Sequence, residues 1–91
     1  MSERRLVVHR SHPHDVYIGR PSKWGNPFRL KDPNDIKERR LVVLRFAHWF
    51  YLPAQVQLRV DARNQLRGKV LGCYCAPPPC HGDVLAKWAN R

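Results

Sequence analysis

The sequence predicts a small α/β domain in which a sheet of three or more strands packs with helices, in the order β-β-α-α-β-α. Two short segments rich in β-branched residues lie near the start, two stretches with helical periodicity follow, and a third strand-like segment precedes a last helical stretch. Strands and helices in this order bury their apolar faces against one another. Because 91 residues rarely support two separate cores, residues 1–91 are expected to form a single domain.

The N-terminal part of the chain is expected to supply two strands and a loop. The first strand lies within residues 4–10, where Leu6-Val7-Val8 is apolar and mostly β-branched. Proline and aspartate within 12–15 favour a turn, and residues 15–19 then form the second strand. Residues 20–28 contain too much proline and glycine for regular structure, so this segment is predicted to be a loop.

The first long helix is predicted over residues 35–52. Asn34 is expected to be its N-cap, and Asp35 suits the positive end of the helix dipole. Apolar residues recur at helical spacing and predict the buried face: Ile36, Val43, Leu44, Ala47, Phe50 and Tyr51.

Pro53 ends that helix and opens a second one, expected over residues 54–67. Its inward residues are predicted to be Val56, Val60 and Leu66, and Gly68 is placed as the C′ residue that ends it. Residues 69–75 are expected to form the third strand, and residues 83–90 the last helix.

The charge balance favours a polyanionic partner. Seventeen Lys and Arg residues stand against seven Asp and Glu residues, a formal charge of +10. We therefore expect nucleic acid or a phosphorylated small molecule as partner. The alternative is a basic surface without a specific ligand, because the cations are spread along the chain and only Lys37, Arg39 and Arg40 form a tight run.

The chain lacks the apolar run needed to cross a bilayer, and its first residues lack a signal-peptide pattern. These features predict a cytoplasmic protein without a membrane partner. In a reducing compartment, three cysteines favour metal binding or thiol chemistry over a disulfide framework.

The cysteines cluster near the C-terminus as Cys73, Cys75 and Cys80, and His81 follows directly. In a strand, Cys73 and Cys75 project from the same face, where two thiolates can ligate one zinc ion. Cys80 and His81 would then complete a Cys₃His set. The spacing is not a common zinc-binding pattern, and an iron–sulfur cluster stays open as an alternative.

Two other interpretations of this cluster also stay open. Cys80 precedes the last predicted helix, whose N–H groups and dipole stabilise a thiolate. It would then be a nucleophile, with His81 or Asp83 as the general acid or base. In the other interpretation the cysteines only pack the strand, and Asp83 caps the helix.

The predicted loop carries a second candidate site, made of Arg20, Ser22, Lys23, Trp24 and Asn26. Arg20 and Lys23 suit phosphate, Ser22 and Asn26 supply a hydroxyl and an amide, and Trp24 can stack on a base. Loops that leave strand ends are common ligand sites in α/β folds. The alternative is a rigid connector in which Trp24 closes one side of the core.

Segments 15–28 and 71–85 together resemble an uncharacterised family of bacteria and their phages, numbered 4326 among the domains of unknown function. Tyr74 stands where the family often has tryptophan. The resemblance implies no activity, but it suggests that the two segments converge on one site. It also implies that these residues occupy motif positions: Arg20, Trp24, Asn26, Cys73, Cys75, Cys80, His81 and Asp83.

The sequence thus predicts a small basic domain that binds a nucleotide or nucleic acid through the loop from Arg20 to Asn26, beside a Cys/His site that holds zinc. A second hypothesis is an enzyme that acts on a nucleotide-like substrate with Cys80 as nucleophile. A third is a phage or bacterial adaptor that binds a host protein.

Overall fold

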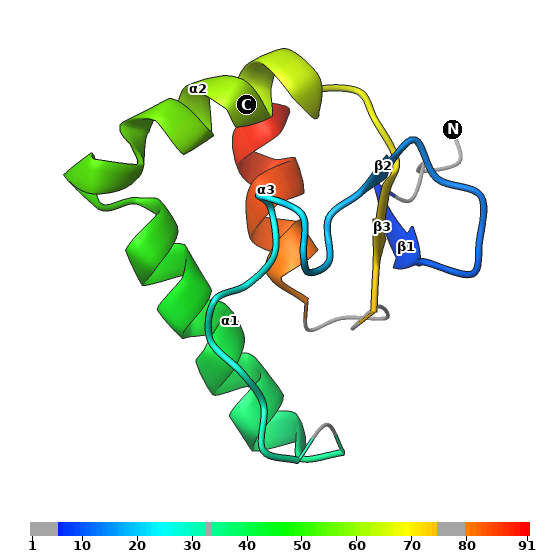
Figure 1. The fold of residues 1–91 in the computed structure, drawn as a ribbon, viewed down its shortest axis with the longest axis vertical. Helices are drawn as coiled ribbons and strands as arrows, with labels where there is room; N and C mark the ends of the chain where they lie inside the picture. Colours follow the sequence, from blue (N-terminus) through cyan, green and yellow to red (C-terminus); the bar gives the residue numbers. More distant parts are fainter. Residues whose placement is uncertain (1–5, 33, 75–79) are drawn as a thin grey trace.

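The computed structural model describes residues 6–32, 34–74 and 80–91. The described strands and helices follow the predicted order, with one additional 3₁₀ turn, η1, between the first two helices (Figure 1). In chain order they are β1 (Val7–His9), β2 (Val16–Tyr17), α1 (Ile36–Phe50), η1 (Pro53–Gln55), α2 (Val56–Gln65), β3 (Leu71–Cys73) and α3 (His81–Ala89).

The sheet has three parallel strands in the order β1-β3-β2, so the last strand in the sequence is the central one. Val7 and Val16 both pair with Leu71, which sets the register on either side of β3. All of β3 is buried, as is typical of a central parallel strand. Because parallel strands end at the same edge, the segments after β2 and after β3 emerge side by side.

Helix α1 begins one residue later than predicted, and its buried face is rotated from the predicted one. Asp35, not Asn34, is the N-cap, and its carboxylate accepts hydrogen bonds from the N–H groups of Lys37 and Glu38. The buried residues are Val42, Phe46 and Phe50, whereas Leu44 is 66% exposed, and Ile36 and Tyr51 are also exposed.

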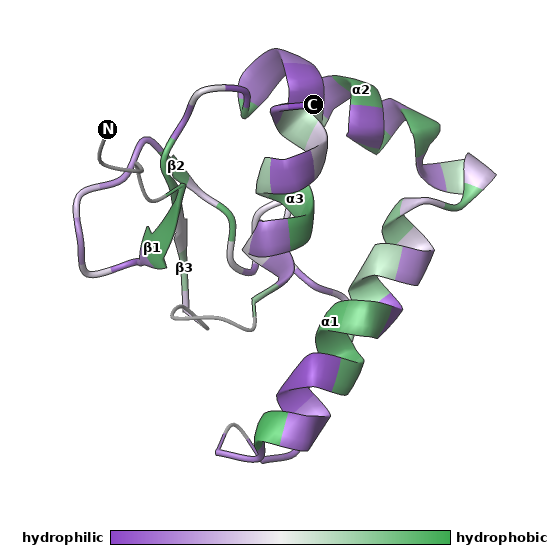
Figure 2. Ribbon diagram, turned by 180° about the vertical axis from the view of Figure 1, so that it is seen from behind, coloured by the Kyte–Doolittle hydropathy of each residue, from purple (hydrophilic) through white to green (hydrophobic). Residues whose placement is uncertain are grey.

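The sequence between residues 41 and 52 is apolar at most positions, so helical periodicity alone does not single out one face. The rings of Phe46 and Phe50 stack with centroids 5.7 Å apart, and this pair faces the core. Only Phe50 of the predicted set is fully buried. Figure 2 shows both hydrophobic and hydrophilic bands on α1.

Helix α2 is two residues shorter at each end than predicted, and its predicted buried face is partly wrong. Leu66, at its C-cap, is fully buried as predicted, and so is Ala62 four residues earlier. Val56 and Val60 are exposed. Gly68 lies two residues beyond the C-cap, one further than the predicted C′ position, and has φ +73°, a left-handed conformation that glycine adopts without strain.

Helix α3 begins at His81, two residues earlier than predicted, because Cys80 and not Asp83 is the N-cap. The helix occupies the centre of the molecule, where it contacts α1, α2, β1 and β3 (Figure 1). A Cβ at Gly82 would lie only 2.6 Å from Ile18 Cδ1, so glycine allows the first turn of α3 to sit directly on the sheet. None of the helices in the described ranges is both long and apolar enough to span a bilayer.

Candidate metal centre and cationic cavity

Three side chains of types that can ligate a metal meet at the N-terminus of α3. Cys73 ends β3, and Cys80 and His81 cap and begin α3, so the fold brings the end of the central strand against the first turn of the helix. The sulfur atoms of Cys73 and Cys80 lie 3.1 Å apart, and they lie 3.7 Å and 3.9 Å from His81 Nδ1. All three residues are buried, and their donor atoms fall within 4.8 Å of one another.

The orientation of the His81 ring determines which nitrogen faces the sulfur atoms. Its Nε2 lies 2.9 Å from the carbonyl oxygen of Ile18. A carbonyl can only accept a hydrogen bond, so Nε2 carries the proton and donates. In the neutral ring Nδ1 then presents its lone pair to Cys73 and Cys80. A backbone carbonyl behind the second nitrogen is the usual arrangement for a histidine that ligates a metal.

The helix end supports the Cys80 sulfur from the other side. The N–H of Gly82 donates to Cys80 Sγ over 3.3 Å, and the carboxylate of Asp83 accepts from the N–H of Cys80 over 3.2 Å. The Asp83 bond belongs to a capping box in which the N-cap cysteine takes the place usually held by serine or threonine. An N–H donor at a helix N-terminus stabilises a thiolate, which is the form that binds zinc.

The spacing of the three donors resembles one face of a zinc tetrahedron. Ideal zinc bonds would separate two sulfur atoms by about 3.8 Å, and a sulfur from a nitrogen by about 3.6 Å. The sulfur–nitrogen distances to His81 are within a few tenths of an ångström of that value, and the Cys73–Cys80 pair would open by about 0.7 Å. These residues can therefore hold one metal ion. Cys75, the remaining predicted ligand, lies outside the described residues.

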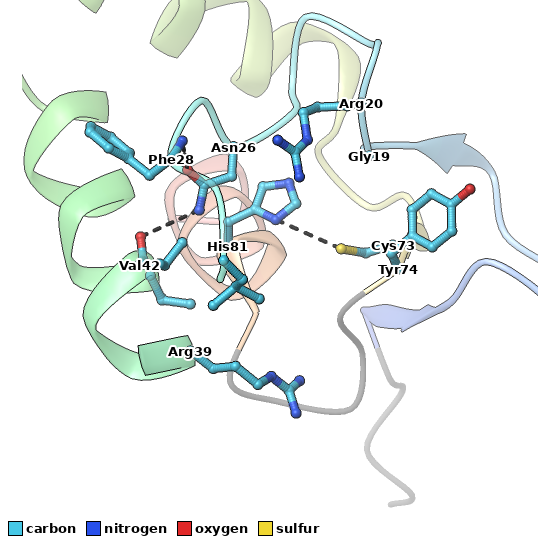
Figure 3. Close-up of a pocket in the computed structure, with 11 residues that line it drawn as sticks. Gly19, Arg20, Asn26, Phe28, Arg39, Val42, Cys73, Tyr74 and His81 are labelled. Atoms are coloured by element: carbon cyan, nitrogen blue, oxygen red, sulfur yellow. Dashed lines mark hydrogen bonds between the residues drawn. The ribbon is translucent and has the colours of Figure 1, made fainter. Parts of the chain in front are cut away.

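A cavity of about 130 Å³ lies against this cluster (Figure 3). Cys73 and His81 line it, together with Arg20 and Asn26 of the predicted loop. The remaining lining residues come from the loop, α1 and the end of β3: Gly19, Phe28, Leu30, Arg39, Val42, Val43 and Tyr74. The cysteine segment and the loop thus share one site in this structure.

Two loop residues predicted to bind phosphate or base reach this cavity. The guanidinium group of Arg20 lies beside His81 (Figure 3). The amide of Asn26 bridges the loop to α1, because Nδ2 donates to the Val42 carbonyl over 3.3 Å and Oδ1 accepts from the N–H of Phe28. Asn26 therefore positions the loop as well as lining the cavity.

The other three loop residues have different partners. The Ser22 hydroxyl donates to the Gly19 carbonyl over 2.6 Å and closes a turn within the loop. Trp24 is 4% exposed and belongs to the core, which is the connector interpretation of the loop. Lys23 lies over the Trp24 ring and pairs with Asp61 at 3.2 Å. Hydrogen bonds from Gln57 and Lys23 hold the pKa of Asp61 below its usual value.

Among the cavity residues that were not predicted from the sequence are one cation and one exposed aromatic residue, Arg39 and Tyr74. Arg39 of α1 had been included in a charged run that can be a solvated helix face, yet the residue lines the cavity (Figure 3). Tyr74 also lines it and is 56% exposed. The position of Tyr74 between Cys73 and Cys75 was the available signal, since neighbours of a candidate site share its surroundings.

The predicted catalytic residues occupy different environments. Cys80 is fully buried and is absent from the described lining of the cavity, and Asp83 is engaged in the helix cap. His81 lines the cavity, and so does Cys73. Of the two described thiols, Cys73 is therefore the one placed to act on a ligand in this cavity.

Comparisons with known proteins agree with the resemblance seen in the two motif segments. A protein described as an uncharacterized 12.4 kDa protein in the nrdA-td intergenic region of Enterobacteria phage T4 is 62% identical over 88 residues, which cover 96% of this chain and 78% of that protein. No solved structure matches the chain. A family model described as a domain of unknown function, DUF4326, matches residues 2–91, and the chain belongs to this family.

Proposed function

We propose that this protein is a small basic domain that binds a nucleotide or nucleic acid in the cavity, beside a zinc ion held by Cys73, Cys80 and His81, and that it acts in the cytoplasm. One observation carries the proposal. The guanidinium-bearing residues Arg20 and Arg39 line the same cavity as two of the three metal-ligating residues. A molecule bound in the cavity would therefore contact both the arginines and the residues that hold the zinc ion.

The lining of the cavity suits a phosphorylated ligand. Guanidinium groups bind phosphate bidentately, and the apolar residues Phe28, Leu30 and Val43 suit the face of a base or sugar. The volume of about 130 Å³ is below the roughly 300 Å³ at which pockets for drug-sized ligands begin. The cavity thus accommodates one portion of a nucleotide, a base or a phosphate with its sugar.

The donor set favours one zinc ion over an iron–sulfur cluster. Three donor atoms within 4.8 Å match the face of a single coordination sphere, and a mixed thiolate and imidazole set suits zinc. Cys75 is the proposed fourth ligand. If it does not ligate, the fourth position is open and is available to the ligand in the cavity, since Cys73 and His81 line that space.

Salt-dependent binding of a labelled single-stranded oligonucleotide tests the ligand. Each neutralised phosphate releases counterion, so the affinity should fall steeply as salt increases. Arg20→Ala and Arg39→Ala should each weaken binding at least about fivefold and reduce the slope of the logarithmic salt plot by about 0.7. Arg40→Ala is the matched control, because Arg40 is an exposed neighbour on α1 that is absent from the described lining.

Equal losses from all three arginine variants would mean that the charge acts as a diffuse surface property. A wild-type protein that binds neither oligonucleotides nor nucleotides at low salt would refute the ligand class.

The buried thiol pair favours a second candidate function, thiol chemistry at Cys73. Cys73 lines the cavity, and His81 Nδ1 lies 3.7 Å from its sulfur in the tautomer that can accept a proton. Cys80 would then be the supporting thiol rather than the nucleophile. Two results would favour this function over zinc binding. Cys73 would be alkylated selectively in a metal-free protein, and its alkylation rate would be unchanged in a Cys80→Ser variant.

A further inference from the structure

A second, open groove adjoins the cavity on the far side of Arg20 and Tyr74. It has a volume of about 550 Å³ and is lined by residues of β1 and β2 and of the segments next to the three strands: His9, Arg10, Ser11, His14, Tyr17, Arg20, Pro21 and Tyr74. Arg20 and Tyr74 belong to the lining of both the groove and the cavity. The two hollows are therefore neighbouring parts of one surface, separated by one cation and one aromatic ring.

The groove has an aromatic platform with a cation beside it. Tyr74 is 56% exposed, and the guanidinium carbon of Arg10 lies 4.0 Å from its ring centroid. Tyr17 meets the edge of Tyr74 with centroids 6.2 Å apart, and its hydroxyl donates to the Arg20 carbonyl over 2.9 Å. These contacts hold Tyr74 and the backbone of Arg20 against the same tyrosine. Burial and the neighbouring Tyr74 raise the pKa of Tyr17.

An exposed aromatic ring in a groove that also contains arginines is a combination that binds unpaired bases. Bases stack on tyrosine rings and on guanidinium planes, while arginines contact the phosphates between the bases. The cavity holds one portion of a nucleotide, and the groove beside it is several times larger. A ligand that fills both therefore has at least two linked nucleotides. In a duplex the bases are already paired and stacked, so they are not available to the Tyr74 ring.

We infer that the ligand of this site is a single-stranded nucleic acid of at least two nucleotides, with one base stacked on Tyr74 in the groove and the adjacent nucleotide in the cavity. Arg10 and Arg20 contact the phosphates, and Tyr74 takes the stacking role that the sequence assigned to Trp24. This inference rests on the proposed function and specifies its ligand class.

Fluorescence anisotropy with a labelled single-stranded thymidine oligonucleotide of about eight nucleotides, its ribouridine counterpart and a duplex of the same length tests the inference. The wild type should bind the single strands at least about tenfold more tightly than the duplex, and a dinucleotide more tightly than a mononucleotide. The comparison of DNA with RNA identifies which strand is preferred.

Tyr74→Ala should weaken single-strand binding by about five- to a hundredfold, whereas Tyr74→Phe should bind like the wild type, because stacking needs the ring and not the hydroxyl. Tyr51→Ala is the control for an exposed tyrosine that does not line the groove. Photocrosslinking of an oligonucleotide that contains 5-iodouracil should place the adduct on Tyr74 in a peptide map.

Three results would overturn the inference. One is binding of duplex as tight as that of single strand, the second is equal affinity for a mononucleotide and a dinucleotide, and the third is unchanged binding by Tyr74→Ala. If Arg20→Ala and Arg39→Ala still weaken binding in those cases, the proposed function holds and only the ligand class is wrong. If the wild type binds no nucleotide or nucleic acid at all, both fail.

Discussion

Two regions line the same cavity: the end of β3 with the start of α3, and the loop from Gly19 to Phe28. They differ in how many of their predicted site residues lie together at the site. At the first region, Cys73, Cys80 and His81 converge with donor atoms within 4.8 Å. At the second, Arg20 and Asn26 line the cavity, whereas Ser22, Lys23 and Trp24 contact the loop, α2 and the core. Short side chains next to a helix cap can reach only a few neighbouring groups. Long side chains on a loop follow whichever neighbour the tertiary structure supplies.

The largest expected effect separates the two regions by metal dependence. A strong chelator should lower the free energy of unfolding by about 3 kcal/mol or more, because metal binding and folding are coupled. For a domain of this size that corresponds to a fall of at least about 10 °C in Tm, measurable by circular dichroism. Cys73→Ser and Cys80→Ser should each lower Tm comparably and make it insensitive to chelator.

Ser22→Ala provides the control from the loop, since its hydroxyl bonds only the Gly19 carbonyl among its described contacts. Its Tm should keep the full response to chelator. A purified wild-type protein that contains no zinc and has the same Tm in chelator would remove the metal centre and leave thiol chemistry or a packing role as the explanation of the cluster.

The next effect tests how tightly α3 is seated beneath the metal-ligating residues. Gly82→Ala should lower the free energy of unfolding by about 1–3 kcal/mol, because the added Cβ would lie 2.6 Å from Ile18 Cδ1 and 2.9 Å from Val7 Cγ1. Lys87→Ala, an exposed position on the same helix, should change it by less than about 0.5 kcal/mol. Urea unfolding measures both, and a neutral Gly82→Ala would mean that the first turn of α3 can shift away from the sheet.

A smaller effect distinguishes cations within the second region. Lys23→Ala should change oligonucleotide affinity by less than about twofold, because the ammonium group pairs with Asp61 on α2 and does not line the cavity. Arg20→Ala, three residues earlier, should weaken binding several times more. Anisotropy titrations at one low salt concentration compare the two. A loss from Lys23→Ala as large as that from Arg20→Ala would mean that the loop binds as a diffuse cationic patch.

The smallest effect is the pH dependence of the Lys23–Asp61 contact. Hydrogen bonds from Gln57 and Lys23 lower the pKa of Asp61 in the folded protein. A carboxyl group with a lowered folded pKa stabilises the fold above its unfolded pKa, and this contribution is lost as the pH falls through the folded value. The stability difference between wild type and Asp61→Asn should therefore be present at about pH 7 and disappear toward about pH 3, with a small amplitude because the pair is exposed. A difference that persists in acid would assign the effect to packing.

Sequence reasoning placed most elements well and their faces less well. The alternation of β-branched segments and helical periodicity specified the order of strands and helices, and Gly68 marked the end of α2. The predicted buried face of α1 was wrong for most of its residues. An almost continuous apolar run does not indicate which side of the helix faces the core. That side was settled by Phe46, which packs against Phe50 and the His81 ring.

By itself, the sequence predicted that Cys73, Cys80 and His81 would lie close together, because Cys80 is only seven positions after Cys73 and His81 follows directly. Only the tertiary structure decided what faces them. The parallel pairing of β2 with β3 brings Arg20 to the same sheet edge as Cys73. The packing of α1 adds Arg39, which precedes Cys73 by more than thirty residues in the sequence. Such contacts depend on how helices and strands pack, a property that local residue patterns do not encode.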